Sequence, residues 1–489
     1  MVHDIDYSSQ ALRSRLPELL GRLPTGLVAS LTGLPREQIR ELVTDERRIP
    51  SAPVLERLAL RTGIRPGRAV VLEPHGRMPE VIPEWFDGGR RRARIVICGM
   101  GNLGHVQATL LAARPELEVR CLVSSRERAQ TLNAAMQEHG GIRVTLGDGR
   151  SIQALPERIT EDPAAVVPDA DFVFLATPCH LHLDQMRRLV PLMREGATLA
   201  AGPAWGGFNW KARRVLEETG AQVRVIGLAG IPTMSKIEVP GRAARVIGVP
   251  KSLNAQQPLD AADRGHATDV LSMLFDQPVL DIHNYLNINL APGNQLLHTG
   301  IMYDLLQRRG DRPFAEPPLF YESLSRSGAR LLKAMSRELL DVATTLADAH
   351  QDYWTFRYAT LHLGIRMGYA GQIRNPWTLH GAIRTNAAYQ GLPTPMVQEA
   401  DGYRPDFSHR FFAEDVPHGL VIARGVAQIA GVATPEMDRV LDWCQQLMGR
   451  EYLVDGRMAG RDLYESAAPQ AFGIDEAQTL IASVLPARS

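Results

Sequence analysis

An apolar strand that runs directly into a glycine-rich turn and then a helix, at residues 94–107 (RIVICGMGNLGHVQ), constrains the fold more than any other feature of the chain. The Gly-x-Gly-x-x-Gly spacing supplies Gly99 for the tight bend, Gly101 where backbone approaches a pyrophosphate, and Gly104 where the helix packs on the strand. The helix N-terminus offers free N–H groups to an anionic phosphate. The glycines alone are weak evidence, but the strand before them and the helix after them are the context that dinucleotide binding requires. The predicted cofactor contacts in this turn are Gly99, Gly101, Asn102, Leu103 and Gly104.

The composition of the chain excludes several classes of partner. Lys plus Arg and Asp plus Glu both number 54, so no field of one sign draws the chain to DNA or to an anionic membrane. The four cysteines form no Cys-x-x-Cys pair, which predicts free thiols in a reducing cytosol and no metal site. No apolar run reaches the ~18 residues of a membrane span, and the N-terminus lacks the basic flank of a signal peptide. We therefore expect a cytoplasmic protein with small-molecule partners and no membrane contact.

Residues 1–85 are predicted to form a small helical appendage, because apolar residues recur there at three- and four-residue spacing. The segments with this spacing are 9–20, 25–32, 35–43 and 52–62. The pattern that begins at residues 28–42 and ends at residues 55–63 looks like a helix-turn-helix of the repressor type. Its basic and acidic residues nearly cancel, however, whereas a module that binds phosphates carries a basic face. We expect no nucleic-acid partner and interpret the appendage as a docking or structural unit. A linker rich in Pro, Gly and charge follows at residues 73–92.

A doubly wound α/β pattern begins at Arg94. Strands and helices alternate along residues 94–201, which implies a mostly parallel sheet with right-handed crossovers. The predicted strands are 94–98, 118–124, 171–176 and 197–201, with further strand-like pieces at 223–227 and 244–249, and the predicted helices are 102–113, 126–138 and 182–193. This Rossmann-type domain is expected to span residues 86–250.

After residue 250 the pattern changes to long helical runs and an excursion rich in Pro, Gly and Asn. The helical runs are 261–275, 323–348, 418–430 and 435–447, and the excursion is 370–408. Residues 251–489 are expected to form a second, mainly helical domain that closes over the sheet. The predicted fold class is therefore α/β, with a Rossmann-type doubly wound parallel sheet, a mainly α-helical C-terminal domain, and the helix-turn-helix-like appendage in front.

The end of the second strand, about twenty residues after the glycines, indicates which dinucleotide is bound. An enzyme that uses NAD usually places Asp or Glu there to hold the ribose 2′-hydroxyl, but this chain has Ser124, Ser125 and Arg126. Two hydroxyls and a guanidinium suit a 2′-phosphate, so we expect NADP(H). An ordinary exposed position in the first turn of a helix would also explain Arg126. Thr177 and Pro178 follow a later strand, where the loop lies along the nicotinamide in such folds, although Thr177 is also suited to hold its own loop.

Two segments of the helical domain carry residues suited to catalysis. Asn294 and His298 lie after a turn containing Pro and Gly, and Arg410 and Asp415 flank a short aromatic run before a helix. Histidine exchanges protons near pH ~6.5, a carboxylate orients and charges it, and an arginine holds a substrate carboxylate. A lone histidine among apolar residues is more often a core residue, and Asp415 at a helix start would also serve as a cap. Neither segment alone establishes catalysis.

Together, several motifs give the chain a resemblance to the opine dehydrogenases, most similar to the branch that makes opine metallophores such as staphylopine and pseudopaline. The motifs are the glycine-rich turn, Ala176-Thr-Pro-Cys-His, Asn294-x-x-x-His298, Phe320-Tyr-Glu, Arg410-x-x-x-Glu-Asp-Val-Pro-x-Gly-Leu and Gly431-Val-Ala-Thr-Pro. The resemblance covers residues 92–450. The chain departs from the family pattern beside the histidine. Relatives tend to show Asn-Pro before it and Pro after it, and Gln295 and Thr299 occupy those positions here.

The resemblance implies a reductive condensation. An amino acid or related amine and a 2-oxo acid of the pyruvate or 2-oxoglutarate type form an imine, which hydride from NADPH reduces to a secondary amine. It further implies that the helical domain is catalytic, with His298 as the acid/base residue, Asp415 as its partner, and Arg410 and Asn294 as substrate contacts. A homodimer and a role in metallophore biosynthesis follow from the same resemblance.

Two other functions stay open on the sequence alone. A 2- or 3-hydroxy acid dehydrogenase would share the sheet and the helical domain and use His298 to deprotonate an alcohol, although the block from Arg410 to Asp415 favours the opine reaction. A regulator that senses NADP(H) would place its N-terminal helices on DNA. The nearly balanced charge of those helices argues against this role.

Overall fold

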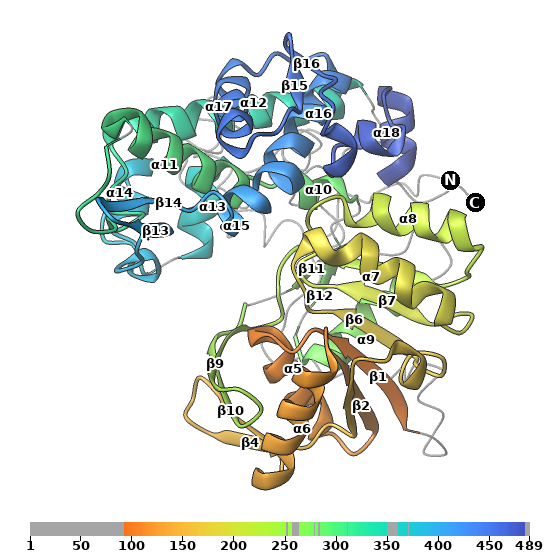
Figure 1. Ribbon diagram of the computed structural model, residues 1–489. Coiled ribbons are helices and arrows are strands. Elements are labelled where there is room, and N and C mark those ends of the chain that lie inside the picture. The colour runs from red at the N-terminus through yellow and green to blue at the C-terminus, as the bar shows by residue number, and fades with distance from the viewer. Residues whose placement is uncertain are drawn as a thin grey trace, which may run out of the picture.

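The computed structural model describes residues 92–250, 253–256, 264–277, 279–281, 284–310, 312–349, 360–369 and 371–484. The appendage predicted at residues 1–85 lies outside the described residues. Figure 1 shows two bodies in the described part, a sheet-based one below and a mainly helical one above. A Rossmann-type sheet followed by a mainly helical domain, as the sequence predicts, is therefore confirmed.

The first body is built on an eight-stranded sheet with the order β12-β11-β8-β7-β6-β1-β2-β5. Every neighbouring pair is parallel except β11 with β8. The strands are β1 (Ala93–Cys98), β2 (Leu117–Leu122), β5 (Arg158–Thr160), β6 (Phe172–Leu175), β7 (Thr198–Ala201), β8 (Arg224–Leu228), β11 (Leu253–Gln256) and β12 (Val279–Asp281). The chain leaves β1 toward β2 on one side and later returns to β6 on the other. The carboxyl ends of β1 and β6 therefore form the switch point where such sheets bind ligands.

Helices cover both faces of this sheet, because its central strands are apolar on both faces. Ile95 and Ile97 of β1 belong to one buried core, and Val96 and Cys98 to the other. The first core is shared with α5 (Asn102–Ala112), α6 (Arg126–His139) and α9 (Arg264–Phe275). The second is shared with α7 (His182–Leu189) and α8 (Phe208–Thr219).

The second core continues from the sheet into the helical body. Trp210 of α8 meets Tyr285 edge-on, with ring centroids 6.2 Å apart, and the Tyr285 hydroxyl donates to the carbonyl of Ala204. The helices of the upper body are α10 (Leu286–Asn289), α11 (Asn294–Arg309), α12 (Arg326–Ala349), α13 (Leu361–Gly368), α14 (Leu379–Arg384), α15 (Arg410–Ala413), α16 (Val421–Ala430), α17 (Pro435–Met448) and α18 (Ala477–Val484). Because the two bodies share one apolar core, their relative position is fixed by packing as well as by the connecting chain.

Two features of the sheets differ from the sequence interpretation. A smaller sheet, with the order β4-β3-β10-β9, contains three strands that the pattern did not predict, and its fourth strand is the one expected at 244–249. Its strands are β3 (Ile142–Thr145), β4 (Ser151–Ala154), β9 (Met234–Val239) and β10 (Ala243–Gly248). The large sheet also continues past residue 250, because β11 and β12 return to its edge beside β8. We therefore propose a domain boundary directly after β12 instead of the one expected at residue 250.

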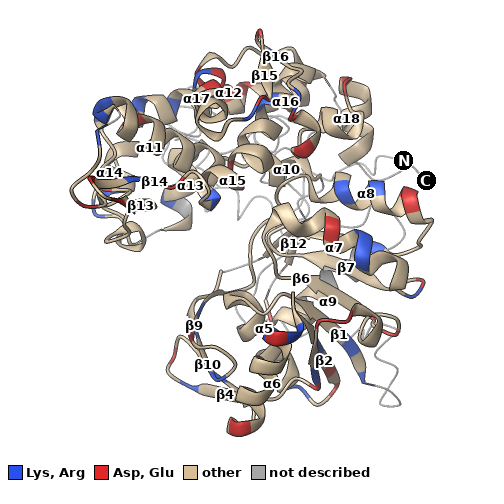
Figure 2. Ribbon diagram, viewed as in Figure 1, with Lys and Arg blue, Asp and Glu red and all other residues tan. Residues whose placement is uncertain are grey.

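Charge is mixed over the described surface. Figure 2 shows Lys and Arg interspersed with Asp and Glu along both bodies, in keeping with the equal totals of the two signs. Among the described helices, none combines the length and the apolar character that crossing a membrane requires.

Candidate active site

The glycine turn after β1 leaves space for a phosphate. Gly99 has a φ of +100°, and a Cβ there would lie 2.5 Å from Thr177 Cγ2. A Cβ on Gly104 would lie 1.9 Å from the Gly99 carbonyl oxygen, so α5 packs directly on the turn. A Cβ on Gly101, in contrast, would meet no described atom within 4 Å, and α5 has no side-chain cap at its N-terminus. Open space and free N–H groups in front of Gly101 fit the pyrophosphate of a dinucleotide.

We expect Gly101→Ala and Gly104→Ala to weaken cofactor binding by different routes. The Gly101 methyl meets open space, so the free energy of unfolding should stay within about 0.5 kcal/mol of wild type while the Kd for NADPH rises about tenfold or more. The Gly104 methyl collides with Gly99, which should lower the free energy of unfolding by about 1–3 kcal/mol. Urea unfolding and fluorescence titration measure both quantities. Equal unfolding free energies in the two variants would contradict the close packing of α5.

A cavity of about 380 Å³ lies at the carboxyl ends of β1, β2 and β6. Five of the predicted cofactor contacts line it, namely Gly99, Gly101, Ser124, Thr177 and Pro178. The other five, Asn102, Leu103, Gly104, Ser125 and Arg126, do not. Asn102 instead joins α5 to the smaller sheet, since its Oδ1 accepts a hydrogen bond from the Ile237 N–H at 2.9 Å. Two basic residues in the lining, Arg128 and Arg188, were not singled out from the sequence.

Ser125, Arg126 and Arg128, at the start of α6, make different contacts. Ser125 is the N-cap, and its Oγ accepts a hydrogen bond from the Arg128 N–H at 3.3 Å. The Arg126 side chain is 81 % exposed and pairs with Glu161 at 3.2 Å. Arg128 turns toward the glycines, where its Nη2 donates to the Met100 carbonyl at 2.9 Å. The guanidinium that lines the cavity therefore belongs to Arg128, and Arg126 lies outside the lining.

Thr177 holds the loop that follows β6. Its hydroxyl donates to Gln185 Oε1 at 2.9 Å, and its carbonyl lies 3.1 Å from His182 Nε2. Burial, reinforced by the charge of Lys211, lowers the pKa of His182 to about 3, so this imidazole is neutral at physiological pH. Because a carbonyl only accepts, Nε2 carries the proton and donates it to Thr177. The loop is thus held from both sides in front of the cavity.

His298 and Asp415, which are 117 residues apart in the sequence, are hydrogen-bonded to each other. His298 Nδ1 lies 2.8 Å from Asp415 Oδ2, and each side chain is only 6 % exposed. An ionised carboxylate only accepts hydrogen bonds, so Nδ1 carries a proton and Nε2 is the nitrogen through which His298 exchanges protons. Asp415 makes no capping hydrogen bond to the π-helical turn that follows it at residues 416–420. The pair therefore has the geometry of an oriented acid/base group.

Aromatic rings enclose this histidine. Phe411 stacks on the imidazole with ring centroids 3.8 Å apart, and Phe320 lies edge-on at 5.7 Å. The hydroxyl of Tyr321 lies 3.1 Å from His298 Nε2. Both imidazole nitrogens therefore have partners, a carboxylate on one side and a phenol on the other. A low-dielectric surrounding of this kind strengthens the His298–Asp415 interaction.

The predicted substrate contacts, Arg410 and Asn294, lie close in sequence to Asp415 and His298, respectively. Arg410 opens α15, five residues before Asp415, and its side chain is 53 % exposed, with Nε 3.5 Å from Glu414 Oε2. Asn294 opens α11 one turn before His298, so the two share a helix face. The half-buried Asn294 side chain has no hydrogen bond to any residue in the described segments.

Glu414 connects this site to the loop after β6. Its Oε1 accepts a hydrogen bond from the Cys179 N–H at 3.0 Å, and Lys211 of α8 donates to the Cys179 carbonyl at 2.9 Å. Both charged side chains are buried, and burial lowers the pKa of Lys211 to about 8. Since Glu414 directly precedes Asp415, the bond to Cys179 fixes the His298–Asp415 pair relative to the loop at Thr177. Sequence reasoning assigned no role to Glu414 or Lys211, although a lysine beside Trp210 within an apolar helix face was a visible signal.

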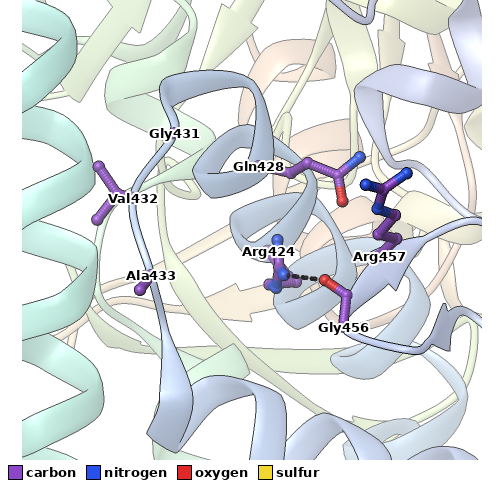
Figure 3. Close-up of a pocket in the computed structure, with 7 residues that line it drawn as sticks. All are labelled: Arg424, Gln428, Gly431, Val432, Ala433, Gly456 and Arg457. Atoms are coloured by element: carbon purple, nitrogen blue, oxygen red, sulfur yellow. Dashed lines mark hydrogen bonds between the residues drawn. The ribbon is translucent and has the colours of Figure 1, made fainter.

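A second cavity, of about 460 Å³, lies elsewhere in the helical body. The end of α16, the turn after it and the hairpin of β15 (Leu453–Val454) and β16 (Arg457–Met458) line it (Figure 3). Arg424 in its wall pairs with Asp438 and donates to the Gly456 carbonyl at 2.7 Å. No predicted site residue lines this cavity, and its buried arginine is already paired. We therefore place the chemistry at the first site.

The sequence of the chain is similar to those of characterised dehydrogenases. Residues 281–448 match the family model described as NAD/NADP octopine/nopaline dehydrogenase, alpha-helical domain. The opine dehydrogenase of Haliotis discus hannai is 30 % identical over 412 residues, which cover 80 % of this chain and 99 % of that protein. The tauropine dehydrogenase of Arabella iricolor is 28 % identical over 394 residues, which cover 79 % and 99 %.

Solved structures extend the similarity to the fold. A structure of octopine dehydrogenase in complex with NADH and agmatine matches with a TM-score of 0.72 and 27 % identity, over 81 % of this chain and all of that one. NADP⁺-bound yersinopine dehydrogenase matches with a TM-score of 0.57 over 80 % of this chain and 99 % of that one. At 13 % identity, this second match is a likeness of fold alone.

Proposed function

Since the chain belongs to the opine dehydrogenase family, we propose that it catalyses the NADPH-dependent reductive condensation of an amino acid or related amine with a 2-oxo acid. The observation that carries the proposal is the buried His298–Asp415 pair, which Glu414 links to the loop at the cofactor cavity. Proton delivery beside a dinucleotide site is what imine formation and reduction need. Octopine dehydrogenase structures of this fold hold NADH with agmatine, with L-arginine and with pyruvate, which are an amine, an amino acid and a 2-oxo acid.

Each chemical step has a residue suited to it. Arg410 pairs with the carboxylate of the 2-oxo acid, and Asn294 contacts the substrates from the same side as His298. The amine nitrogen attacks the oxo carbon and a proton moves from nitrogen to oxygen, which gives a carbinolamine. Protonated His298 is the source of the proton that reaches the hydroxyl, the C–O bond breaks with its electrons on departing water, and the nitrogen lone pair forms the C=N bond.

Asp415 and the cofactor complete the reaction. The Asp415 carboxylate stabilises the His298 imidazolium and fixes the orientation of the ring. The nicotinamide, when bound, supplies the hydride that reduces the imine carbon. Gly101 and the free N–H groups of α5 would hold the pyrophosphate, and the loop held by Thr177 would border the nicotinamide.

The proposal is tested by incubating the protein with NADPH, a 2-oxo acid and a panel of amines while NADPH consumption is followed. We expect consumption only when both carbon substrates are present. Consumption with the oxo acid alone would indicate a hydroxy acid dehydrogenase. Tight NADPH binding with no turnover of any pair would favour a cofactor sensor and contradict the proposal.

We also propose NADP(H) as the preferred cofactor. The end of β2 carries no carboxylate, and two guanidinium groups, those of Arg126 and Arg128, lie in the first turn of α6. Arg126→Asp should therefore lower the ratio of kcat/KM for NADPH to that for NADH by about tenfold or more. Glu161→Gln is the matched control, because it removes the partner of Arg126 without removing the positive charge, and it should leave the ratio unchanged or raise it. An unchanged ratio in Arg126→Asp would remove Arg126 from cofactor selection.

We propose further that the product of the reaction is a metal-chelating opine. The product joins a secondary amine to a neighbouring carboxylate, and such nitrogen and oxygen donors chelate transition-metal ions. The resemblance of the motifs to metallophore enzymes supports it. Titration of the isolated product with Zn²⁺ or Ni²⁺ should show tight binding, and a product without measurable affinity would contradict this role. The homodimer and the cytoplasmic location stay predictions. Light scattering would measure the oligomeric state, and cell fractionation would measure the location.

A further inference from the structure

We propose that the hydroxyl of Tyr321 is a further catalytic group, which passes the proton between His298 and the reacting oxygen of the substrate. The inference rests on the proposed reductive condensation and names the group that touches the substrate in it. Its starting point is the position of the phenol at the nitrogen through which His298 exchanges protons.

The hydrogen bond of His298 to Asp415 determines which group donates in the hydrogen bond between His298 and Tyr321. Nδ1–H is held by Asp415 at 2.8 Å, so in neutral His298 the other nitrogen, Nε2, accepts a hydrogen bond from the Tyr321 hydroxyl at 3.1 Å. When His298 is protonated, Nε2–H donates to the Tyr321 oxygen, and the phenol proton must turn to another acceptor. The hydrogen-bonded series of Asp415, His298 and Tyr321 therefore ends in a phenol hydroxyl. When His298 is protonated, this hydroxyl can donate its proton to another acceptor.

Packing holds the phenol in this position. The Tyr321 ring is stacked on Tyr389 with centroids 4.1 Å apart and an interplanar angle of 14°, and Phe320 meets it at 4.9 Å and 73°. The Phe320 N–H donates to the Leu392 carbonyl at 2.7 Å, which fixes the backbone beside Tyr321. For a substrate oxygen to reach Nε2 directly, this packed ring would have to move. A relay through the hydroxyl needs no such movement.

The surroundings of Tyr321 keep its phenol neutral. Burial, together with the nearby Tyr369 and Asp415, raises the pKa of Tyr321 well above its ordinary value, so the phenol stays protonated at any working pH. The charge of Arg410 acts in the opposite direction and lowers the pKa of Tyr321. Arg410 directly precedes Phe411, whose ring stacks on His298. The proposal requires that a 2-oxo acid whose carboxylate pairs with Arg410 places its reacting oxygen, on the adjacent carbon, against the phenol.

The proton relay acts in the dehydration of the carbinolamine. The phenol O–H proton moves to the substrate hydroxyl, the C–O bond breaks with its electron pair on the departing water, and the nitrogen lone pair forms the C=N bond. At the same time the proton on His298 Nε2 moves to the phenol oxygen. Tyr321 is restored as a neutral phenol, and His298 is left neutral with its Nδ1 proton on Asp415. No oxidant or reductant takes part in this step.

Tyr321→Phe tests the relay, with Tyr389→Phe as the matched control. The two tyrosines are stacked on each other and are both 8 % exposed, but the Tyr389 hydroxyl is bonded to Tyr369 instead of His298. Tyr321→Phe should lower kcat about 10²-fold or more, with the KM for NADPH nearly unchanged. It should also alter the solvent isotope effect on kcat in D₂O, which reports proton transfer. Tyr389→Phe should keep both the rate and the isotope effect of the wild type.

The activities of the wild type and the two variants distinguish failure of the relay from failure of the proposed function. If the wild type does not consume NADPH in the presence of both carbon substrates, the proposed function fails and the relay with it. If the wild type is active and Tyr321→Phe keeps its kcat and isotope effect, the relay alone is overturned and substrate reaches Nε2 directly. An equal loss of kcat in both variants, accompanied by equal losses of thermal stability, would assign the hydroxyls to packing and also overturn the relay.

Discussion

Replacing His298 by alanine is expected to lower kcat for the condensation about 10²–10⁴-fold while the Kd for NADPH stays nearly unchanged. The imidazole is the proton source for the departing hydroxyl, so its loss removes the acid from the rate-determining chemistry. Cofactor binding should persist, because the cavity is lined by residues of the sheet-based body, whereas His298 lies on α11 of the helical body. Steady-state rates at saturating substrates and fluorescence titration with NADPH measure the two effects.

A matched control for this variant is His139→Ala. His139 lies in the last turn of α6 and is not part of the proposed site, so its replacement should leave both kcat and the Kd for NADPH at their wild-type values. A His298→Ala variant that kept most of its rate would remove the histidine from the mechanism. A variant that lost NADPH binding as well would indicate a folding defect, which urea unfolding of the same sample identifies.

Asp415→Asn is expected to lower kcat about 10²-fold or more with little change in fold. The amide has nearly the shape of the carboxylate, but it supplies no charge to stabilise the His298 imidazolium. If its N–H faces Nδ1, it also selects the tautomer with the proton on Nε2, which is the wrong one for accepting a proton from Tyr321. Because the two residues act as one unit, the double variant with His298→Ala should lose no more rate than His298→Ala alone.

Asp438→Asn provides the comparison for Asp415→Asn. Asp438 is also a carboxylate in a partly buried pair of the helical body, where it binds Arg424 beside the second cavity. Its replacement should cost stability without changing kcat. Equal rates for Asp415→Asn and the wild type, or additive losses in the double variant, would contradict the assignment of His298 and Asp415 as one acid/base pair.

Local features of the fold were predictable from the sequence because the residues that make them are neighbours in the chain. The turn from Gly99 to Gly104 combines a strand, three glycines and a helix within a few residues, and its geometry follows from sterics alone. The small strands β3 and β4 were not predicted, although Ile142 and Val144 alternate with polar residues. Four-residue strands, of which β3 buries alternate residues and β4 only partly covers them, give too short a pattern to stand out.

The candidate site could be predicted only in part. The segments with His298 and Asp415 were identified, but only the resemblance to a family joined them, because 117 residues of intervening chain give no spacing rule for a contact. Arg126 was singled out because it directly follows the strand, and Arg128 was missed, although the helical turn points its side chain toward the glycines. Glu414 and Tyr321 lie within motifs that carry the family resemblance, but the segments to which they are hydrogen-bonded could not be predicted from those motifs.

Whether reduction joins an amine to a 2-oxo acid is decided by the mass spectrum of the product formed with NADPH deuterated at the transferred position. We expect a secondary amine that contains both carbon skeletons and a single deuterium, on the carbon that came from the oxo group. A deuterated 2-hydroxy acid beside unchanged amine would contradict this expectation.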